Sequence, residues 1–173
     1  MKHLLSMRRS GPSKYLVASL VALSACWPYG FAGGGLPSNI HTVAVLPFEN
    51  ETPQAELQRE MWQSLRSEMQ ARLGLRDAPE SRADAVVRGT LLRYDTGIPI
   101  SYSANRGQVT SARRKLQIVC DIEIVDQKTG KMLWQRKGIS AEGEYEEPNE
   151  VNGRREALKK LISDVIEGAQ SQW

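Results

Sequence analysis

The stretch that decides the fold of this chain is LQIVCDIEIV, residues 116–125. Every second residue from Leu116 is apolar, and Gln117 and Asp121 lie at positions between them. Because successive side chains of a strand point to opposite faces, this alternation predicts a half-buried antiparallel strand. It also places Cys120 on the apolar face, as a small buried hydrophobe rather than a reactive thiol.

The neighbouring segments extend this strand into a sheet. Residues 126–130, DQKTG, form a turn sequence in which Gly130 is free to take a positive φ, and 132–139 is expected to return as the hairpin partner. Upstream, 83–94 predicts another strand of mixed pattern. The run 40–48 predicts a nearly continuous apolar strand with Pro47 near its end.

Two amphipathic helices complete the predicted domain. Thr52 can cap the first, with Pro53 in the first helical position, and Gly74 is expected to end it. Apolar residues recur along it at every fourth position, namely Leu57, Met61, Leu65, Met69 and Leu73. The second helix is predicted over 150–169, with a stripe of Leu158, Leu161, Ile162, Val165 and Ile166. The order β-α-β-β-β-α predicts an α+β fold with two helices on one face of a four-stranded mixed sheet.

Folding alone does not explain the stretch 95–111, which lies between two predicted strands and is followed by Arg113, Arg114 and Lys115. Loops of this length in a compact domain are usually functional or mobile. One interpretation is a contact loop with a cationic base, since arginine pairs bidentately with phosphate. The other is a floppy connection with a solvated cluster of charges. Both interpretations stay open at this point.

The N-terminal residues have the pattern of a lipoprotein signal peptide. Basic residues precede an apolar run over 15–23, and LSAC at 23–26 resembles a lipobox, so we expect 1–25 to be removed and Cys26 to carry lipid. The alternative is an ordinary signal peptide with an incidental cysteine. The run is shorter than the roughly 20 apolar residues of a membrane span, so acyl chains would provide the anchor. Trp27, where Asp would favour the inner membrane, predicts sorting to the outer membrane.

Processing at Cys26 would leave a Gly- and Pro-rich tether over 26–38 and a single domain over 39–173. Four of the 23 basic residues and none of the 20 acidic ones precede Cys26, which leaves 19 against 20. The domain is therefore close to neutral, and its global charge gives no reason to expect a nucleic-acid partner.

The sequence offers little catalytic equipment. His41 is the one imidazole beyond the predicted signal peptide, so neither a Ser-His-Asp or Cys-His site nor a multi-histidine metal site is expected. Asp121 and Glu123 fall on the polar face of a strand. The segment 142–147, EGEYEE, is interpreted as a solvated loop, with a divalent cation as the alternative. We expect no enzyme, no catalytic residue, no metal and no cofactor.

Several short motifs, in this order, resemble the lipopolysaccharide-assembly lipoprotein LptE family. They are Cys26 followed by Tyr29-Gly30-Phe31 and Leu36-Pro37, then Phe48-x-Asn50-x-Thr52, Ala83-Asp84 to Gly89, and Asp126 to Gly130. Trp27-Pro28 departs from the Gly that usually follows the family's cysteine. Because the motifs span nearly all of the predicted mature chain, the resemblance extends to the whole domain.

The resemblance implies a non-enzymatic outer-membrane lipoprotein, with acyl groups such as palmitate at Cys26. It implies a seat inside the lumen of the β-barrel LptD, where the chain acts as a plug and helps lipopolysaccharide reach the outer leaflet. It also implies contact between basic residues near loops and the acidic lipid. By position, the candidates here are Arg106, Arg113, Arg114 and Lys115.

An alternative resemblance rests on AVLPFEN at 44–50 and the helix after it. Periplasmic lipoproteins that activate penicillin-binding proteins, and subunits of curli-type secretion pores, have similar segments. The chain would then regulate a cell-wall enzyme or form a pore. A short tether argues against the first role, because about a dozen residues span only roughly 40 Å when extended.

Overall fold

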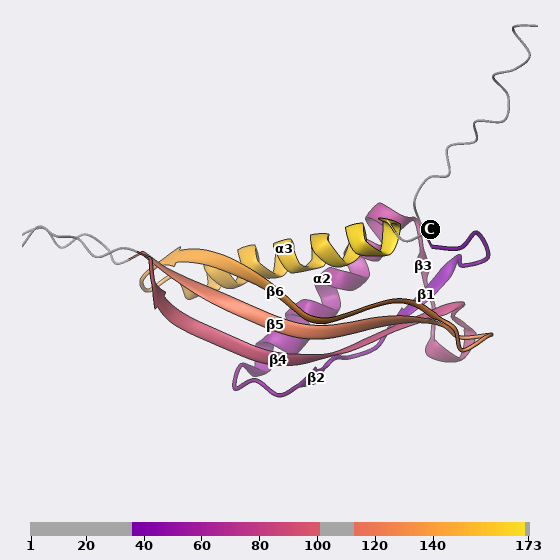
Figure 1. The fold of residues 1–173 in the computed structure, drawn as a ribbon, viewed down its shortest axis with the longest axis horizontal. Helices are drawn as coiled ribbons and strands as arrows, with labels where there is room; N and C mark the ends of the chain where they lie inside the picture. The colour runs from indigo at the N-terminus through magenta and orange to yellow at the C-terminus, as the bar shows by residue number, and fades with distance from the viewer. Residues whose placement is uncertain (1–35, 101–112, 172–173) are drawn as a thin grey trace, which may run out of the picture. The chain divides into compact units, whose positions relative to one another are not determined.

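The computed structural model describes residues 36–100 and 113–171 of the chain, shown in Figure 1. The predicted signal peptide, Cys26 and Arg106 lie outside these residues. The elements are β1 (Thr42–Val45), β2 (Glu49–Asn50), α2 (Ala55–Leu73), β3 (Arg76–Asp77), the short 3-10 helix η2 (Glu80–Arg82), β4 (Ala85–Pro99), β5 (Arg113–Asp126), β6 (Met132–Glu146) and α3 (Glu150–Ser171). The predicted α+β class is confirmed.

The strands form one mixed sheet in the order β3-β1-β4-β5-β6, and β2 pairs with β4 beyond the end of β1. β1 runs parallel to β3 and β4, whereas β4, β5 and β6 form an antiparallel meander. The four predicted strands are present. The sheet has two further strands, β2 and β3, each only two residues long. Two residues are too few to show a periodic pattern in a sequence.

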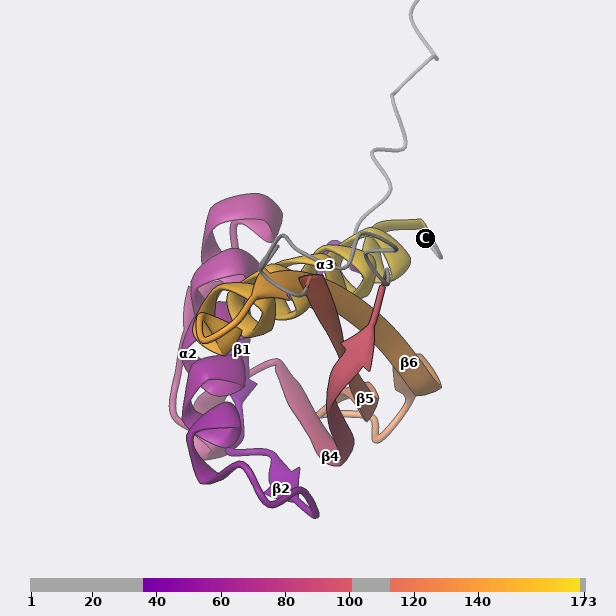
Figure 2. The ribbon, with the colours of Figure 1, turned by 90° about the vertical axis from the view of Figure 1, so that its left-hand side faces the viewer.

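Both helices pack on one face of the sheet (Figure 2). β5 turns Leu116, Ile118, Cys120, Ile122 and Ile124 toward them, and none of these side chains is more than 1% exposed. Opposite them α2 buries Leu57, Met61, Leu65 and Met69, and α3 buries Leu158, Leu161, Ile162, Val165 and Ile166. The predicted stripes are confirmed except at Leu73, the last residue of the first stripe, which is only partly buried. Each fully buried side chain contributes about 1.5–3 kcal/mol by leaving water.

The two ends of α2 differ in how well the sequence predicted them. The helix begins at Ala55 after Gln54, which makes no capping bond with its side chain, so the prediction of Thr52 as cap and Pro53 as first helical residue is wrong. Thr52 instead donates its hydroxyl to Asn50 Oδ1 at 2.7 Å and accepts the Gln54 N–H at 3.3 Å. These bonds form a turn before the helix. At the other end Gly74 takes φ +66° and ends the helix as predicted.

Two segments predicted to be loops belong to strands. β4 continues to Pro99 and pairs there with Arg114, so 95–99 is strand rather than loop. A register shift between Asp95 and Ile98 absorbs Gly97, whose φ of +72° favours glycine. β6 likewise continues to Glu146, so most of 142–147 is strand rather than solvated loop. Its glutamates alternate with buried Gly143 and Tyr145.

Candidate functional site at the distal end of the sheet

The candidate cations lie where β5 begins. We call this the distal end, the left-hand end of the sheet in Figure 1, where β4 and β6 finish and β5 starts. Arg113 and Lys115 alternate with Leu116 along β5 and therefore lie on the face away from the helices. Arg114 lies on the helix side, opposite the buried Tyr145. Three consecutive cations are thus divided between the two faces.

On the open face each cation is paired with a glutamate of β6. Arg113 Nη2 donates to Glu144 Oε2 at 2.9 Å, and Lys115 Nζ lies 2.9 Å from both carboxylate oxygens of Glu142. The register places Arg113 opposite Glu146 and Lys115 opposite Glu144. Both ion pairs therefore run diagonally between the strands, and we call these four residues, Arg113, Glu144, Lys115 and Glu142, the charge ladder.

The residues of the charge ladder remain open to solvent. The side chains of Arg113 and Glu144 are 59% and 49% exposed, and those of Lys115 and Glu142 are 32% and 47% exposed. Exposed ion pairs of this kind contribute about 0–1 kcal/mol to stability. The ladder therefore holds its side chains weakly.

Arg114 is held differently, by groups on the helix side. Its Nη1 donates to the Gly97 carbonyl at 2.9 Å, and its Nε pairs with the Glu147 carboxylate. The Gly97 N–H donates to the Tyr145 hydroxyl at 3.0 Å. Tyr145 and Arg114 thus bind the backbone N–H and the backbone carbonyl of Gly97, respectively. These bonds hold the irregular end of β4 against β5 and β6.

The cationic base predicted from sequence is thus matched by carboxylates. Arg113, Arg114 and Lys115 face four glutamates, namely Glu142, Glu144, Glu146 and Glu147. Sequence reasoning missed this pairing because it treated the two charged segments separately. Counting back along the hairpin from the turn at Gly130 would have placed the two segments at the same end of the sheet, since β5 and β6 pair along nearly their whole length, but two register shifts decide which residues meet.

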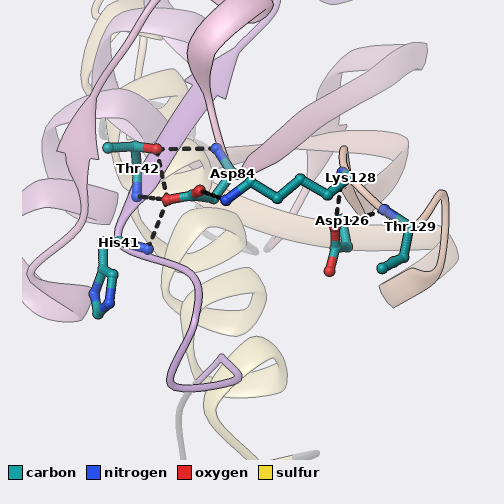
Figure 3. Close-up of polar contacts among 6 residues, drawn as sticks. All are labelled: His41, Thr42, Asp84, Asp126, Lys128 and Thr129. Atoms are coloured by element: carbon teal, nitrogen blue, oxygen red, sulfur yellow. Dashed lines mark hydrogen bonds and ion pairs between the residues drawn. The ribbon is translucent and has the colours of Figure 1, made fainter.

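The opposite end of the sheet, which we call the proximal end, is organised around Asp84 (Figure 3). Asp84 Oδ2 accepts the backbone N–H groups of His41 and Thr42 at 3.2 and 3.1 Å and the Thr42 hydroxyl at 2.8 Å. Its Oδ1 accepts Lys128 Nζ at 2.7 Å. The hydrogen bonds from Lys128 and Thr42 hold the pKa of the Asp84 carboxyl well below its usual range. One carboxylate thus joins the start of β1, the start of β4 and the β5–β6 turn.

The same turn is stabilised by Asp126, whose Oδ1 accepts the N–H groups of Lys128 and Thr129 at 2.8 and 3.0 Å. The bond from Thr129 lowers the pKa of the Asp126 carboxyl. Gly130 takes φ +69°, as predicted. The motifs at 83–84 and 126–130 therefore serve the architecture of the proximal end.

Gly89, the last residue of the motif that begins at Ala83, also has a structural role. A Cβ at this position would lie 2.2 Å from the Asp121 carbonyl and 2.6 Å from Cε1 of Phe48, whose ring is fully buried. At this position only glycine leaves room for the Phe48 ring.

A buried arginine joins the two helices, and sequence reasoning missed it. Arg154 of α3 is 5% exposed, and its Nε and Nη2 donate to the two carboxylate oxygens of Glu60 at 2.9 and 3.0 Å. Nearby, the Tyr94 hydroxyl donates to Glu150 at 2.6 Å, and burial together with this carboxylate raises the pKa of Tyr94. An arginine in a polar helix segment gives no sign of burial, so only packing shows this cluster.

The space between α2 and α3 is a groove of about 470 Å³, with Leu158 and Ile162 among its lining residues. Glu68, Arg72 and Arg155 also line it. Both signs of charge therefore meet in the groove, which does not select a ligand by charge. Within the described residues, no three His, Cys, Asp or Glu side chains come together as a metal site.

These observations define a class of protein: a two-layer α+β domain with both helices on one face of the sheet and motifs that stabilise the fold. The opposite face is open at the distal end and partly buried around Ala44, Ala83 and Val86 near the proximal end. The same fold occurs in PelC of Paraburkholderia phytofirmans, which crystallises as a dodecamer; the TM-score is 0.50 at 20% identity, over 82% of this chain and 96% of that one. Lipoprotein GNA1162 of Neisseria meningitidis matches with a TM-score of 0.45 at 20% identity, over 73% and 95% of the two chains. A minor lipoprotein of Acinetobacter baumannii gives 0.45 at 12% identity, over 73% and 91%.

The family model for lipopolysaccharide assembly, LptE, matches residues 40–169. The chain belongs to the LptE family, as its motifs predicted. No curated protein matches it.

Proposed function

We propose that this protein is an outer-membrane lipoprotein that plugs the β-barrel LptD and assists it in assembling lipopolysaccharide in the outer leaflet. The observation that carries the proposal is the match of the lipopolysaccharide-assembly family to 40–169, which includes every described strand and nearly all of α3. A helix-covered sheet with one open face suits a plug, because it offers a rigid surface to a surrounding wall.

The proposed anchor is lipid on Cys26, after removal of 1–25. Residues 26–38 would then form the tether to a domain over 39–173 on the periplasmic side of the outer membrane. More than one acyl chain is needed for stable attachment to a bilayer, and lipoprotein processing supplies several.

In the described part of the chain, no helix combines the length and the apolarity that crossing a bilayer requires.

We propose a structural rather than an enzymatic role. Cys120 is fully buried, and burial raises the pKa of its thiol to about 12, which removes this thiol from nucleophilic chemistry. His41 is exposed, and its backbone rather than its ring takes part in the proximal cluster. Neither residue has the arrangement of a catalytic nucleophile or base.

The proposed contact with lipopolysaccharide is at the distal end, through Arg113, Arg114 and Lys115, with Arg106 from the chain outside the described residues. Guanidinium and ammonium groups are the partners that phosphate groups prefer. Arg113 and Lys115 suit this role better than Arg114, since both are on the open face and, among the residues that the structure describes, are held by carboxylates that are themselves exposed. Arg114 is already bound to the Gly97 carbonyl.

The test is affinity purification of the tagged, lipidated protein from membranes in mild detergent, followed by mass spectrometry. We expect a large β-barrel in a one-to-one ratio. Recovery of a penicillin-binding protein, or only of further copies of this chain, would contradict the proposal and favour the regulator or the pore. A matched control replaces Cys26 with Ser, which prevents lipidation and should reduce the recovery of the barrel.

A further inference from the structure

The charge ladder leaves no cation of the candidate site unoccupied within the described residues. Glu144 holds Arg113, Glu142 holds Lys115 with both of its oxygens, and Arg114 is bound on the other face. A phosphate group that binds Arg113 and Lys115 must therefore take the place that the two carboxylates now fill.

The backbone of β6 at the charge ladder is bound by α3, whereas the side chains of the ladder are held only by one another among the described residues. The Glu144 N–H donates to Glu156 Oε2 at 3.2 Å, and the Glu142 carbonyl accepts Lys160 Nζ at 3.0 Å. Glu156 and Lys160 both belong to α3 and pair with each other at 2.7 Å. The helix thus holds the edge of β6 at the two residues whose carboxylates face Arg113 and Lys115. Exchange of partners on the open face requires only rotation of exposed side chains.

We infer that Glu142 and Glu144 are internal competitors that select the ligand of the distal end, and that they favour phosphomonoesters. This inference rests on the proposed function. A carboxylate and a phosphodiester each carry one negative charge, so exchanging one for the other gains little. A phosphomonoester carries about −1.5 to −2 charges near pH 7 and three acceptor oxygens, so it outcompetes a glutamate for the same cation. The two glutamates therefore reject singly charged lipid head groups.

The experiment uses the full lipidated protein in detergent and measures the Kd for purified lipopolysaccharide. In the double variant Glu142→Gln and Glu144→Gln, both cations lose their charged partners while the side chains keep their size. We expect the Kd to fall about three- to tenfold. We also expect binding to phosphatidylglycerol, a lipid whose phosphodiester carries one negative charge, to be weak in the wild type and to rise in the double variant.

A matched control is Glu123→Gln. Glu123 forms a cross-strand ion pair with Arg88 on the same open face, nearer the proximal end. The substitution frees a cation at another place and should leave the Kd unchanged. Adding Arg113→Gln and Lys115→Gln to the double variant should abolish its gain.

The outcomes distinguish a failure of the inference from a failure of the proposed function. If the wild type binds and the double variant binds no more tightly, the glutamates are not competitors, whereas the function stands. If neither binds lipopolysaccharide, both ideas fail. Binding by the double variant alone supports competition, and an equal gain in Glu123→Gln would show a nonspecific effect of charge and overturn the inference.

Discussion

The two ends of the sheet use the same chemical groups in opposite ways. At the proximal end one carboxylate, Asp84, accepts two backbone N–H groups, a hydroxyl and an ammonium. At the distal end the bonds of the charge ladder join only the tips of long, exposed side chains. Bonds to backbone fix the position of the chain, whereas bonds between long side chains leave their partners free to exchange. The first arrangement therefore fixes the backbone at the proximal end, whereas the second contributes little to the stability of the distal end.

At the distal end the exposed charge ladder lies over a tightly packed contact between β6 and α3. Gly143 lies in β6 between the two ladder glutamates and faces α3, where a Cβ would come 1.8 Å from the Gly153 carbonyl oxygen. The side chains on the surface of this end are therefore held weakly, whereas the helix and strand beneath them are in close backbone contact.

The largest effect is expected from Gly143→Ala. The added methyl group meets backbone rather than a flexible side chain, so α3 must shift, and we expect the free energy of unfolding to fall by about 3 kcal/mol. Urea denaturation followed by circular dichroism measures it. Ser140→Ala, at an exposed position of the same strand, serves as control and should change stability by less than about 0.5 kcal/mol. Equal stability of the two variants would show that the contact beneath the ladder is not tight.

Asp84→Ala removes the carboxylate that organises the proximal end. Four donors lose their acceptor, and because bonds to a charged group contribute about 1.5–3 kcal/mol each but are not additive, we expect a loss of about 2–3 kcal/mol in unfolding free energy. Glu144→Ala removes a carboxylate at the distal end and should cost less than about 1 kcal/mol. Similar losses in the two variants would remove the distinction between the ends.

The stability of the proximal end is expected to depend on pH through its two carboxylates. The pKa values of Asp84 and Asp126 are lowered in the folded protein, so both groups stabilise it above their unfolded value near 4 and lose this contribution as the pH falls further. We expect Asp84→Asn to lose less stability than the wild type between pH 7 and pH 3. Chemical denaturation at a series of pH values measures the two slopes, and parallel curves would contradict the assignment to Asp84.

The smallest effect on stability is expected from the double variant Glu142→Gln and Glu144→Gln. Both ion pairs are exposed, so the free energy of unfolding should change by less than about 0.5 kcal/mol in either direction. Thermal unfolding with and without 0.5 M salt checks this, because screening should also leave the wild type nearly unchanged. A loss of 2 kcal/mol or more would make the ladder a structural feature like the Asp84 cluster.

The sequence predicted the parts of the fold that depend on periodic burial. The alternation around Cys120, the stripe of α2 and the glycines at 74 and 130 all lie where local pattern and tertiary packing agree. It failed where packing overrode local preference. The segment 95–99 contains Gly97 and Pro99 and has the composition of a loop, yet pairing with β5 keeps it in the sheet.

The candidate site was predicted only in part. The positions of Arg113 and Lys115 at the start of β5 followed from the pattern, but their partners did not. Pairing depends on the register of the hairpin, which contains two shifts, one between Cys120 and Ile122 and one between Ile124 and Val125. No local signal around Glu142 or Arg154 indicates which distant charge each will meet.

The strict alternation at the distal end has a consequence for how such a domain can change over evolutionary time. Beyond Gly143 the hairpin of β5 and β6 alternates a face toward the helices with a face toward solvent. Insertion or loss of two residues in each strand keeps every remaining side chain on its face. The length of this hairpin can therefore vary between related proteins while the core beneath the helices stays intact. The distance to which the distal end extends can evolve separately from stability.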